Sequence, residues 1–453
     1  MFKRFIAPSS FYKDVLVVAI PFMLQQLITS SLNLVDNLMV GQLGGIALGG
    51  VAITNRFFMI AVFATFGVTG AASIFIAQYF GAKDEENIKQ AFRYSLTSVY
   101  LVMIPFIVLG LVAPQTVLGF FSQDPAILQT GSEYIRIVAF AFIPLGLTFA
   151  LASAMRSVGE TKIPLLISIV AVSMNAILNY VLIFGHLGFP RLGVAGAAYA
   201  TVISRTFEMI AMLVSLKIKH FSFSTKISQI FHISAYNLKT ITIKALPLTI
   251  NEFLWAGGMA TLFKLYATRG TEVIAGLSIA STTADLFFVL FGGMAVATTV
   301  MISQPLGANE LDEARNRGYY MLGFSAMLAL FLGSVMFFSS MIVPQLYDVT
   351  QIEREIASSV LRVMSVMFVI YMSTAECYFI LRAGGDMKST LIMDSVFMWV
   401  VNVPVVFVVA YYTNWPILAV YLAGQSTDFL KLMISYSLVK KEKWVKNLTI
   451  QNT

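Results

Sequence analysis

The chain has 453 residues, of which 58% are hydrophobic and only 12% are charged, and its mean hydropathy is +0.81. Soluble domains carry about 25% charged residues, so the composition excludes an assembly of soluble domains and indicates a polytopic membrane protein. The single cysteine, Cys377, excludes an internal disulfide framework. The net charge of +7 requires no nucleic-acid partner, because most basic residues fall on one side of the predicted membrane spans.

Apolar runs bounded by charged or turn residues predict twelve transmembrane helices, six in each half of the chain. In chain order they cover residues 15–38, 53–79, 94–119, 134–154, 164–184, 195–216, 246–266, 275–303, 319–343, 363–381, 390–411 and 417–438. The first run lacks a small-residue cleavage site, so we interpret it as an uncleaved helix and not as a signal peptide.

The two halves match at one fixed offset of 226 residues, without a gap. Pro21 falls on Pro247, and Gly44 falls on Gly270. The same register aligns further pairs, which include Gly67 with Gly293, Gln78–Ala82 with Gln304–Ala308, and Arg156–Lys162 with Arg382–Lys388. An even number of spans per half gives both copies the same orientation. The predicted fold is therefore all-α, with two pseudo-symmetric six-helix bundles that form a parallel repeat, as in secondary transporters.

Composition places the lobe boundaries. We predict a first lobe over residues 1–216, a polar cytoplasmic linker over 217–244, a second lobe over 245–438 and a basic cytoplasmic tail over 439–453. The positive-inside rule then puts both termini in the cytoplasm and the chain in the plasma or inner membrane. We interpret the tail segment Lys440–Trp444 as a membrane-surface anchor.

No segment supports an energy-coupling enzyme. The sequence lacks a Gly-rich loop ending in Gly-Lys-Ser/Thr, and His186, His220 and His232 are too scattered for a metal site. We expect no cofactor and no metal other than Na⁺. If the chain is a transporter, we then expect transport to be driven by an ion gradient, of H⁺ or Na⁺, or to be passive.

Asp36 is the first candidate for a coupling residue, because ionisable groups inside spans are expensive and usually functional. It ends a polar stripe on one face of the first helix, which includes Gln25, Gln26 and Asn33 as candidates to line a cleft. The alternative is an interfacial Asp that caps the following turn. A helix-5 pair, Asn175 and Asn179, and Thr201 on helix 6 bear oxygens suited to a Na⁺ or protonation site.

The second half offers a different set of acids. Asn251 and Glu252 lie near the start of helix 7, and Glu252 stands where the first half has Gln26; Trp255 follows one turn later and is a further cleft candidate. We interpret Asn251 and Glu252 as a site for the coupling cation or the substrate.

Glu376 and Asp394 flank a cytoplasmic loop of the second half and join the same candidate site. If the two acids lie within reach of one another, one of them can carry a proton. The alternative is that Arg382 and Lys388 of the loop neutralise them. Asp285, in the middle of helix 8, is a weaker cleft candidate without a partner in the sequence.

Two intramembrane charge pairs are interpreted as structural. Arg205 with Glu208 and Asp428 with Lys431 are each three residues apart, close enough to neutralise each other on one helix face.

Several motifs resemble the multidrug and toxic compound extrusion (MATE) family. Leu34–Gly44 is similar to its helix-1 motif, and its later signatures resemble Arg156–Lys162, Asn175–Tyr180, Gly196–Thr201, Pro247, Gln304–Ala308 and Arg382–Asp386. The resemblance implies two six-helix bundles around a central cleft and cation-driven efflux by alternating access. It also assigns the first-lobe cation or proton to Asp36, with Asn175 and Thr201 beside it.

The chain departs from the family pattern at two positions. Many members carry Asp where this chain has Asn179, so the first-lobe site loses one formal charge. Other branches place a helix-7 Glu at the position of Trp255, one turn beyond Glu252. A single carboxylate among neutral amides favours a proton over Na⁺.

We therefore predict an antiporter, not an enzyme, that exports amphipathic and often cationic organic compounds in exchange for H⁺ rather than Na⁺. The alternative is a flippase or exporter of a lipid-linked saccharide or a specific metabolite. An intramembrane enzyme is disfavoured because no histidine falls within a predicted span. The expected partners are small organic substrates and membrane lipids, without nucleic acid, and we expect a monomer.

Overall fold

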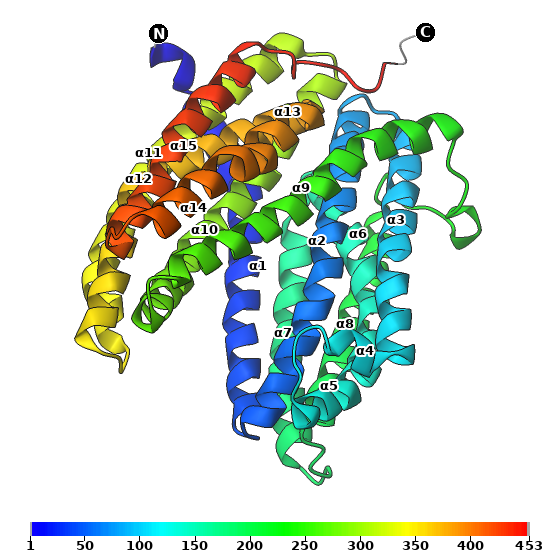
Figure 1. Ribbon diagram of the computed structural model, residues 1–453. Coiled ribbons are helices and arrows are strands. Elements are labelled where there is room, and N and C mark those ends of the chain that lie inside the picture. Colours follow the sequence, from blue (N-terminus) through cyan, green and yellow to red (C-terminus); the bar gives the residue numbers. More distant parts are fainter. Residues whose placement is uncertain (1, 451–453) are drawn as a thin grey trace. The chain divides into compact units, whose positions relative to one another are not determined.

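The computed structural model describes residues 2–450, which form helices joined by turns and contain no strand (Figure 1). The first half contains η1 (Phe2–Phe5), α1 (Ser9–Gly41), α2 (Gly45–Gly81), α3 (Glu85–Val112), α4 (Pro114–Leu118), α5 (Pro125–Val138), η2 (Ala139–Ala141), α6 (Phe142–Ser157), α7 (Lys162–Phe184) and α8 (Val194–Lys219). After η3 (Ile227–Gln229), the second half contains α9 (Ala235–Ala267), α10 (Thr271–Gly307), α11 (Leu311–Ile342), η4 (Val343–Leu346), α12 (Gln351–Ala383), α13 (Met387–Leu391), η5 (Ile392–Val396), η6 (Met398–Asn402), α14 (Val403–Tyr412) and α15 (Ile417–Lys440).

Within residues 2–450, eleven helices are long and apolar enough to cross a membrane, so the chain is a multi-pass membrane protein of the predicted all-α class. They contain every predicted span except 246–266 and the end of 94–119, because α3 ends at Val112. The span 246–266 lies within α9, a helix of 33 residues. Asn251 and Glu252 lie near its middle and Lys264 in its last turn, and these polar residues lower its hydropathy. The twelve-helix arrangement of the prediction is consistent with this set.

Backbone geometry repeats between the halves at the predicted offset. Gly44 and Gly270, which open equivalent helices, have φ of +107° and +122°. Lys83 and Asn309, equivalent residues of the next turn, have φ of +58° and +63°. The left-handed region is uncommon for residues other than glycine, so matched values at matched positions indicate that the two turns have the same conformation. The internal repeat therefore extends to individual torsion angles.

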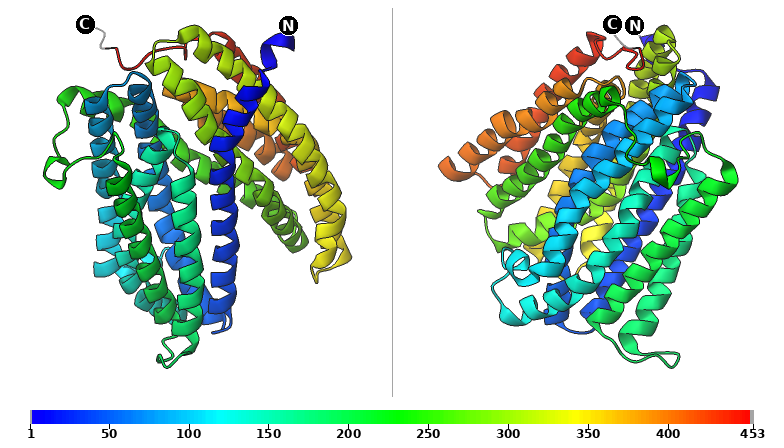
Figure 2. Two further views of the ribbon diagram at one scale, coloured as in Figure 1. Left: turned by 180° about the vertical axis from the view of Figure 1, so that it is seen from behind. Right: turned by 90° about the vertical axis from the view of Figure 1, so that its right-hand side faces the viewer.

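The chain divides into two compact units. One contains residues 20–80 and 84–249, and in it α8 packs on α5, α6 and α7, while α3 packs on α6. The other contains residues 2–19, 81–83 and 250–450, and in it α12 packs on α10, α11 and α15. Within this second unit the dark blue N-terminal segment runs beside the beginning of α11 (Figure 2). We call the units the first unit and the second unit below.

The predicted polar linker is not one irregular segment. α8 continues to Lys219 and α9 begins at Ala235. Between them, Phe223 is fully buried against Phe92 of α3. Arg93 of α3 donates to the Thr225 hydroxyl at 2.9 Å and to a backbone carbonyl of the same segment at 3.0 Å. The segment is therefore anchored on α3 inside the first unit. The predicted lobe boundaries stay predictions.

The interpretation of the tail as a membrane-surface anchor is wrong for its aromatic residue. Trp444 is 0% exposed, and its indole NH donates to the Val439 carbonyl at 2.9 Å. Glu442 binds Arg4 at 2.9 Å and Arg315 at 2.8 Å. Gly318 of α11 leaves room for its ring, and Gly384, after α12, leaves room for its backbone. The lysines of the tail are exposed, but the segment around Trp444 is part of the protein core.

Candidate functional site

Asp36 of the first unit is held by two amides of α7. Its Oδ1 accepts a hydrogen bond of 2.6 Å from the Asn179 amide nitrogen. The Asn175 amide lies 3.2 Å from Oδ1 and 3.0 Å from Oδ2, and it donates to both when its nitrogen faces the carboxylate. Asn175 and Asn179 are four residues apart, so they lie on one helix face. The structure therefore brings together the first three residues of the predicted site.

Thr201 lies at the border of this site and not against the carboxylate. Its hydroxyl donates to the Ala197 carbonyl at 3.0 Å, within α8. Tyr134 of α5, which is buried, interacts with both Thr201 and Asp36. Sequence reasoning missed Tyr134. Tyr134 stands at the start of a predicted span, directly after Ser132 and Glu133, and a tyrosine has no charge to mark it as a site residue.

Arg205, one turn beyond Thr201 on α8, forms the predicted pair with Glu208, at 2.8 Å. The Glu208 side chain is almost completely buried and that of Arg205 is about one-third exposed. Arg205 also acts electrostatically on Asp36. The basic side chain beside Asp36 is therefore already engaged by its own helix, and Asp36 itself has no ion-pair partner among residues 2–450.

The polar stripe on α1 is largely solvent-accessible. Gln26 and Asn33 are exposed, Gln25 is half-buried, and the Thr29 hydroxyl donates to the Gln25 carbonyl at 2.8 Å. Exposed amides within a membrane span are costly against lipid. The stripe therefore fits a water-filled surface better than a lipid-facing one, and its predicted role in lining a cleft stays a prediction.

The second unit contains an ion pair that links three helical segments. Lys431 Nζ of α15 lies 2.7 Å from Asp394 Oδ1 of η5. Asp394 Oδ2 accepts from the Asn251 amide of α9 at 3.0 Å. Asn251 also accepts from the Ser395 hydroxyl at 2.6 Å through its side-chain oxygen. The structure therefore joins Asn251 to Asp394 as a candidate site and adds Lys431 to it.

Lys431 corrects the predicted pairing on α15. The sequence spacing predicts Asp428 as its partner, but the ion pair is with Asp394. Asp428 is half-buried and is an electrostatic neighbour of the same ammonium. Asp394 lies in η5, a π-helical turn of the continuous run from α13 to α14 (orange in Figure 1). This run packs against α15, and the packing brings Asp394 to Lys431. Interhelical proximity outweighs the i,i+3 spacing.

Glu252 and Trp255 lie on the same helix as Asn251. Glu252 is half-buried, with Arg382 and Asp394 as its charged neighbours. Trp255 is exposed, one turn beyond it. Glu252 is therefore an electrostatic neighbour of Asp394 as well as of Arg382.

Glu376 is separate from this cluster. Its side chain is 0% exposed, and its Oε1 accepts from the Thr298 hydroxyl of α10 at 2.6 Å. Its Oε2 has no partner among the described residues. Glu376 and Asp394 therefore have different partners, which are neither each other nor Arg382 or Lys388. The two sequence hypotheses for this acid pair both fail because α12 directs Glu376 into the helix core.

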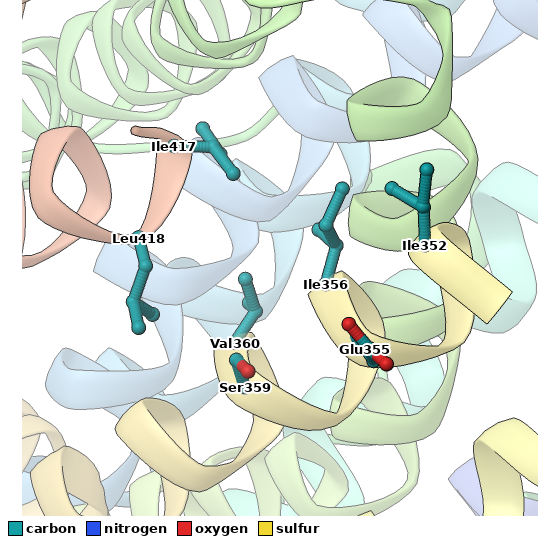
Figure 3. A pocket seen from close by; sticks show the side chains of 7 residues that line it. All are labelled: Ile352, Glu355, Ile356, Ser359, Val360, Ile417 and Leu418. Atoms are coloured by element: carbon teal, nitrogen blue, oxygen red, sulfur yellow. The ribbon is translucent and has the colours of Figure 1, made fainter. Parts of the chain in front are cut away.

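Two further features lie apart from the acid clusters. Asp285 is exposed on α10. Figure 3 shows a pocket between α12 and the start of α15, with Glu355 as its only acidic side chain among the residues that line it. The Glu355 carboxylate accepts from the Gln351 amide at 2.8 Å. The rest of this lining is mostly aliphatic, so the pocket offers no cation site.

Comparison with known proteins identifies the family. The sequence model of the MatE family matches twice, over residues 21–181 and 247–408, and the two matches begin at the equivalent prolines Pro21 and Pro247. The chain belongs to the MatE family. The predicted resemblance is confirmed, and the double match reproduces the internal repeat.

Individual relatives agree with the MatE assignment. The chain is 27% identical, over 87% of its length and 86% of the relative's, to the "Probable multidrug resistance protein NorM" of Halalkalibacterium halodurans. It is 26% identical to the "Probable multidrug resistance protein YoeA" of Bacillus subtilis, over 97% and 96% of the two chains. A crystal structure of a MATE protein in complex with MaL6 has a TM-score of 0.86 and 21% identity, with coverage of 95% and 96%. The MatE fold therefore spans nearly the whole chain.

Proposed function

We propose that this MatE chain is an H⁺-coupled antiporter of the plasma or inner membrane, with both termini in the cytoplasm. It would export amphipathic, often cationic organic compounds by alternating access and would perform no enzymatic reaction. The observation that carries the proposal is the Asp36 carboxylate, which is bonded at 2.6 Å by an amide of α7 and has no ionic partner among residues 2–450. A charged side chain within a span is costly unless something neutralises it.

The donor set around Asp36 favours a proton over Na⁺. Na⁺ needs several oxygen ligands, as other hard cations do. Asn179 instead directs its NH₂ group at the carboxylate, and an NH₂ group cannot bind a metal cation. Both Asp36 oxygens therefore already accept hydrogen bonds from amide groups. A proton, in contrast, needs only one free carboxylate lone pair.

The substrate class is supported by the exposed polar stripe and by the acids of the second unit. Gln26 and Asn33 present amides that can bind the polar groups of many compounds. Trp255 presents an exposed aromatic face, a surface that attracts organic cations. The two relatives above are named as multidrug resistance proteins, which agrees with a broad range of organic substrates. We propose a monomer, without a cofactor.

Vesicles that contain the purified protein test the proposal. An imposed proton gradient should drive efflux of a cationic dye without Na⁺, and Asp36→Asn should reduce this efflux at least tenfold because the amide cannot release a proton. Asp14→Asn is the matched control, since Asp14 is an exposed acid on the same helix. Efflux by Asp36→Asn at the wild-type rate, or a response to a Na⁺ gradient with none to ΔpH, would contradict the proposal.

A further inference from the structure

The Asp394 carboxylate is already paired with a positively charged side chain of the same protein. The Lys431 ammonium lies 2.7 Å from Asp394, and the two side chains are 14% and 18% exposed. Removal of either partner from such a pair is costly, because it leaves the other charge unpaired inside the protein. Partial exposure, however, leaves the pair open to exchange with a cation from outside. The resident ammonium therefore occupies the place that such a cation would take.

The two partners of the pair differ in their freedom to move. Asp394 belongs to η5, which is fastened to α9 by the Ser395 hydroxyl, at 2.6 Å from Asn251 Oδ1. The following turn, η6, is fastened by the Trp399 indole NH, which donates to the Leu254 carbonyl at 2.8 Å. π-Helical turns are rare and are frequent at functional sites. Lys431, in contrast, reaches Asp394 on a flexible four-carbon stem. The carboxylate therefore stands on an anchored turn, and the ammonium stands on the more flexible side chain.

Lys431 also has a second carboxylate within its range. Asp428 precedes it by three residues on α15, a spacing that places both on one helix face. It is half-buried and acts electrostatically on Lys431. An ammonium displaced from Asp394 can therefore pair with Asp428 and remain neutralised. Displacement then costs far less than the exposure of an unpaired charge to the helix bundle.

The first unit arranges its charges differently. At the offset of 226 residues, Ser168 stands for Asp394 and Arg205 stands for Lys431. Arg205 binds Glu208 on its own helix. Arg205 thus pairs with an acid of its own helix and has Asp36 as an electrostatic neighbour, whereas Lys431 pairs with an acid of another helical segment.

We propose that Asp394 is a binding site for the positive charge of an organic cation, and that Lys431 is a built-in competitor which occupies Asp394 in the absence of substrate and pairs with Asp428 when the substrate binds. This inference rests on the proposed export of organic cations and extends it to a specificity device. Neutral compounds cannot displace the ammonium, so the pair discriminates by charge. Glu252, a charged neighbour of Asp394, adds to the attraction for the incoming cation.

Equilibrium binding of tetraphenylphosphonium, a monovalent organic cation, to the purified full-length protein tests the proposal without any gradient. Lys431→Gln should bind it about tenfold more tightly than the wild type, because the competitor is absent. Asp394→Asn should bind it about tenfold more weakly. Asp428→Asn should bind it several-fold more weakly, because displaced Lys431 then lacks a partner. Lys264→Gln, an exposed lysine of α9 outside the cluster, is the matched control and should match the wild type.

Triphenylphosphine oxide, a neutral compound of similar shape, separates competition from a structural role. Its affinity should stay unchanged in all of these variants. The double variant Asp394→Asn/Lys431→Gln removes both charges, keeps polar groups of similar size and should elute as a folded protein with weak phosphonium binding. Unchanged or weaker phosphonium binding by folded Lys431→Gln overturns the proposal, as does an equal loss for both probes. Neither result bears on gradient-driven efflux through Asp36, which the vesicle assay tests separately.

Discussion

At the scale of single residues, the acids Asp36, Asp394 and Glu376 differ in what neutralises them. Asp394 has an ammonium at 2.7 Å, and Asp36 has amides. Glu376 has one hydroxyl, from Thr298, and no basic side chain within ion-pairing distance among the described residues. A carboxylate in such a place would be an uncompensated buried charge. Glu376 is therefore best described as a neutral carboxylic acid that accepts one hydrogen bond.

This description predicts that Glu376→Gln is tolerated. The glutamine carbonyl can accept the same hydrogen bond from Thr298, so we expect the melting temperature of the purified protein to stay close to that of the wild type. Thr298→Val removes the donor and should destabilise the protein by about 1–3 kcal/mol, since a buried acceptor loses its partner. A large fall in melting temperature for Glu376→Gln would instead indicate that the residue carries a charge with an ionic role.

Asn179 offers a second test at the same scale. Asn179→Asp replaces the NH₂ donor to Asp36 with a second carboxylate and gives the site the oxygen ligands that Na⁺ requires. We expect efflux by this variant to respond to a Na⁺ gradient, which the wild type should ignore. Asn37→Asp, an exposed position on α1, controls for the added charge. A Na⁺ response in both variants, or in neither, would argue against the assigned role of the amide.

At the scale of elements, the ends of the helices are held by segments that look peripheral in the sequence. The stretch after α15 inserts Trp444 into the second unit, and Glu442 ties Arg4 and Arg315 together. The stretch after α8 is held by Arg93 and by the buried Phe223. Short polar segments thus fasten long helices that otherwise contact one another mainly through apolar side chains.

Trp444→Ala should therefore destabilise the second unit. The loss of a fully buried tryptophan typically costs about 3–5 kcal/mol, and we expect a clear fall in the melting temperature of the purified protein. Trp415→Ala, at a side chain that is 52% exposed, is the matched control and should change it little. Equal effects of the two substitutions would show that the tail is not part of the core.

At the scale of the whole molecule, the repeat made most of the fold predictable. The apolar runs located the spans, and the offset of 226 residues recurs in the torsion angles of Lys83 and Asn309. The contacts of Asp36 with α7 were predictable too, because Asn175 and Asn179 share one helix face. The ion-pair partner of Lys431 was not predictable from the sequence, because it depends on how a π-helical turn packs against α15. The burial of Trp444 could not be predicted either. Lysines flank it in the sequence, and a tryptophan among lysines has the pattern of a membrane-surface anchor.

The distribution of tryptophan gives the molecule an optical asymmetry. All four tryptophans lie in the second unit: Trp255, Trp399 and Trp415 are 37%, 38% and 52% exposed, and Trp444 is 0% exposed. Ultraviolet-excited indole emission from the unmodified protein thus reports on the second unit alone. Tetraphenylphosphonium at Asp394 should shift this emission, because Trp255 lies on the helix that carries Asn251 and Trp399 donates to the Leu254 carbonyl of that helix. Proton binding at Asp36 should be spectroscopically silent until Tyr180→Trp places an indole in the first unit, so one spectrometer can tell the two events apart.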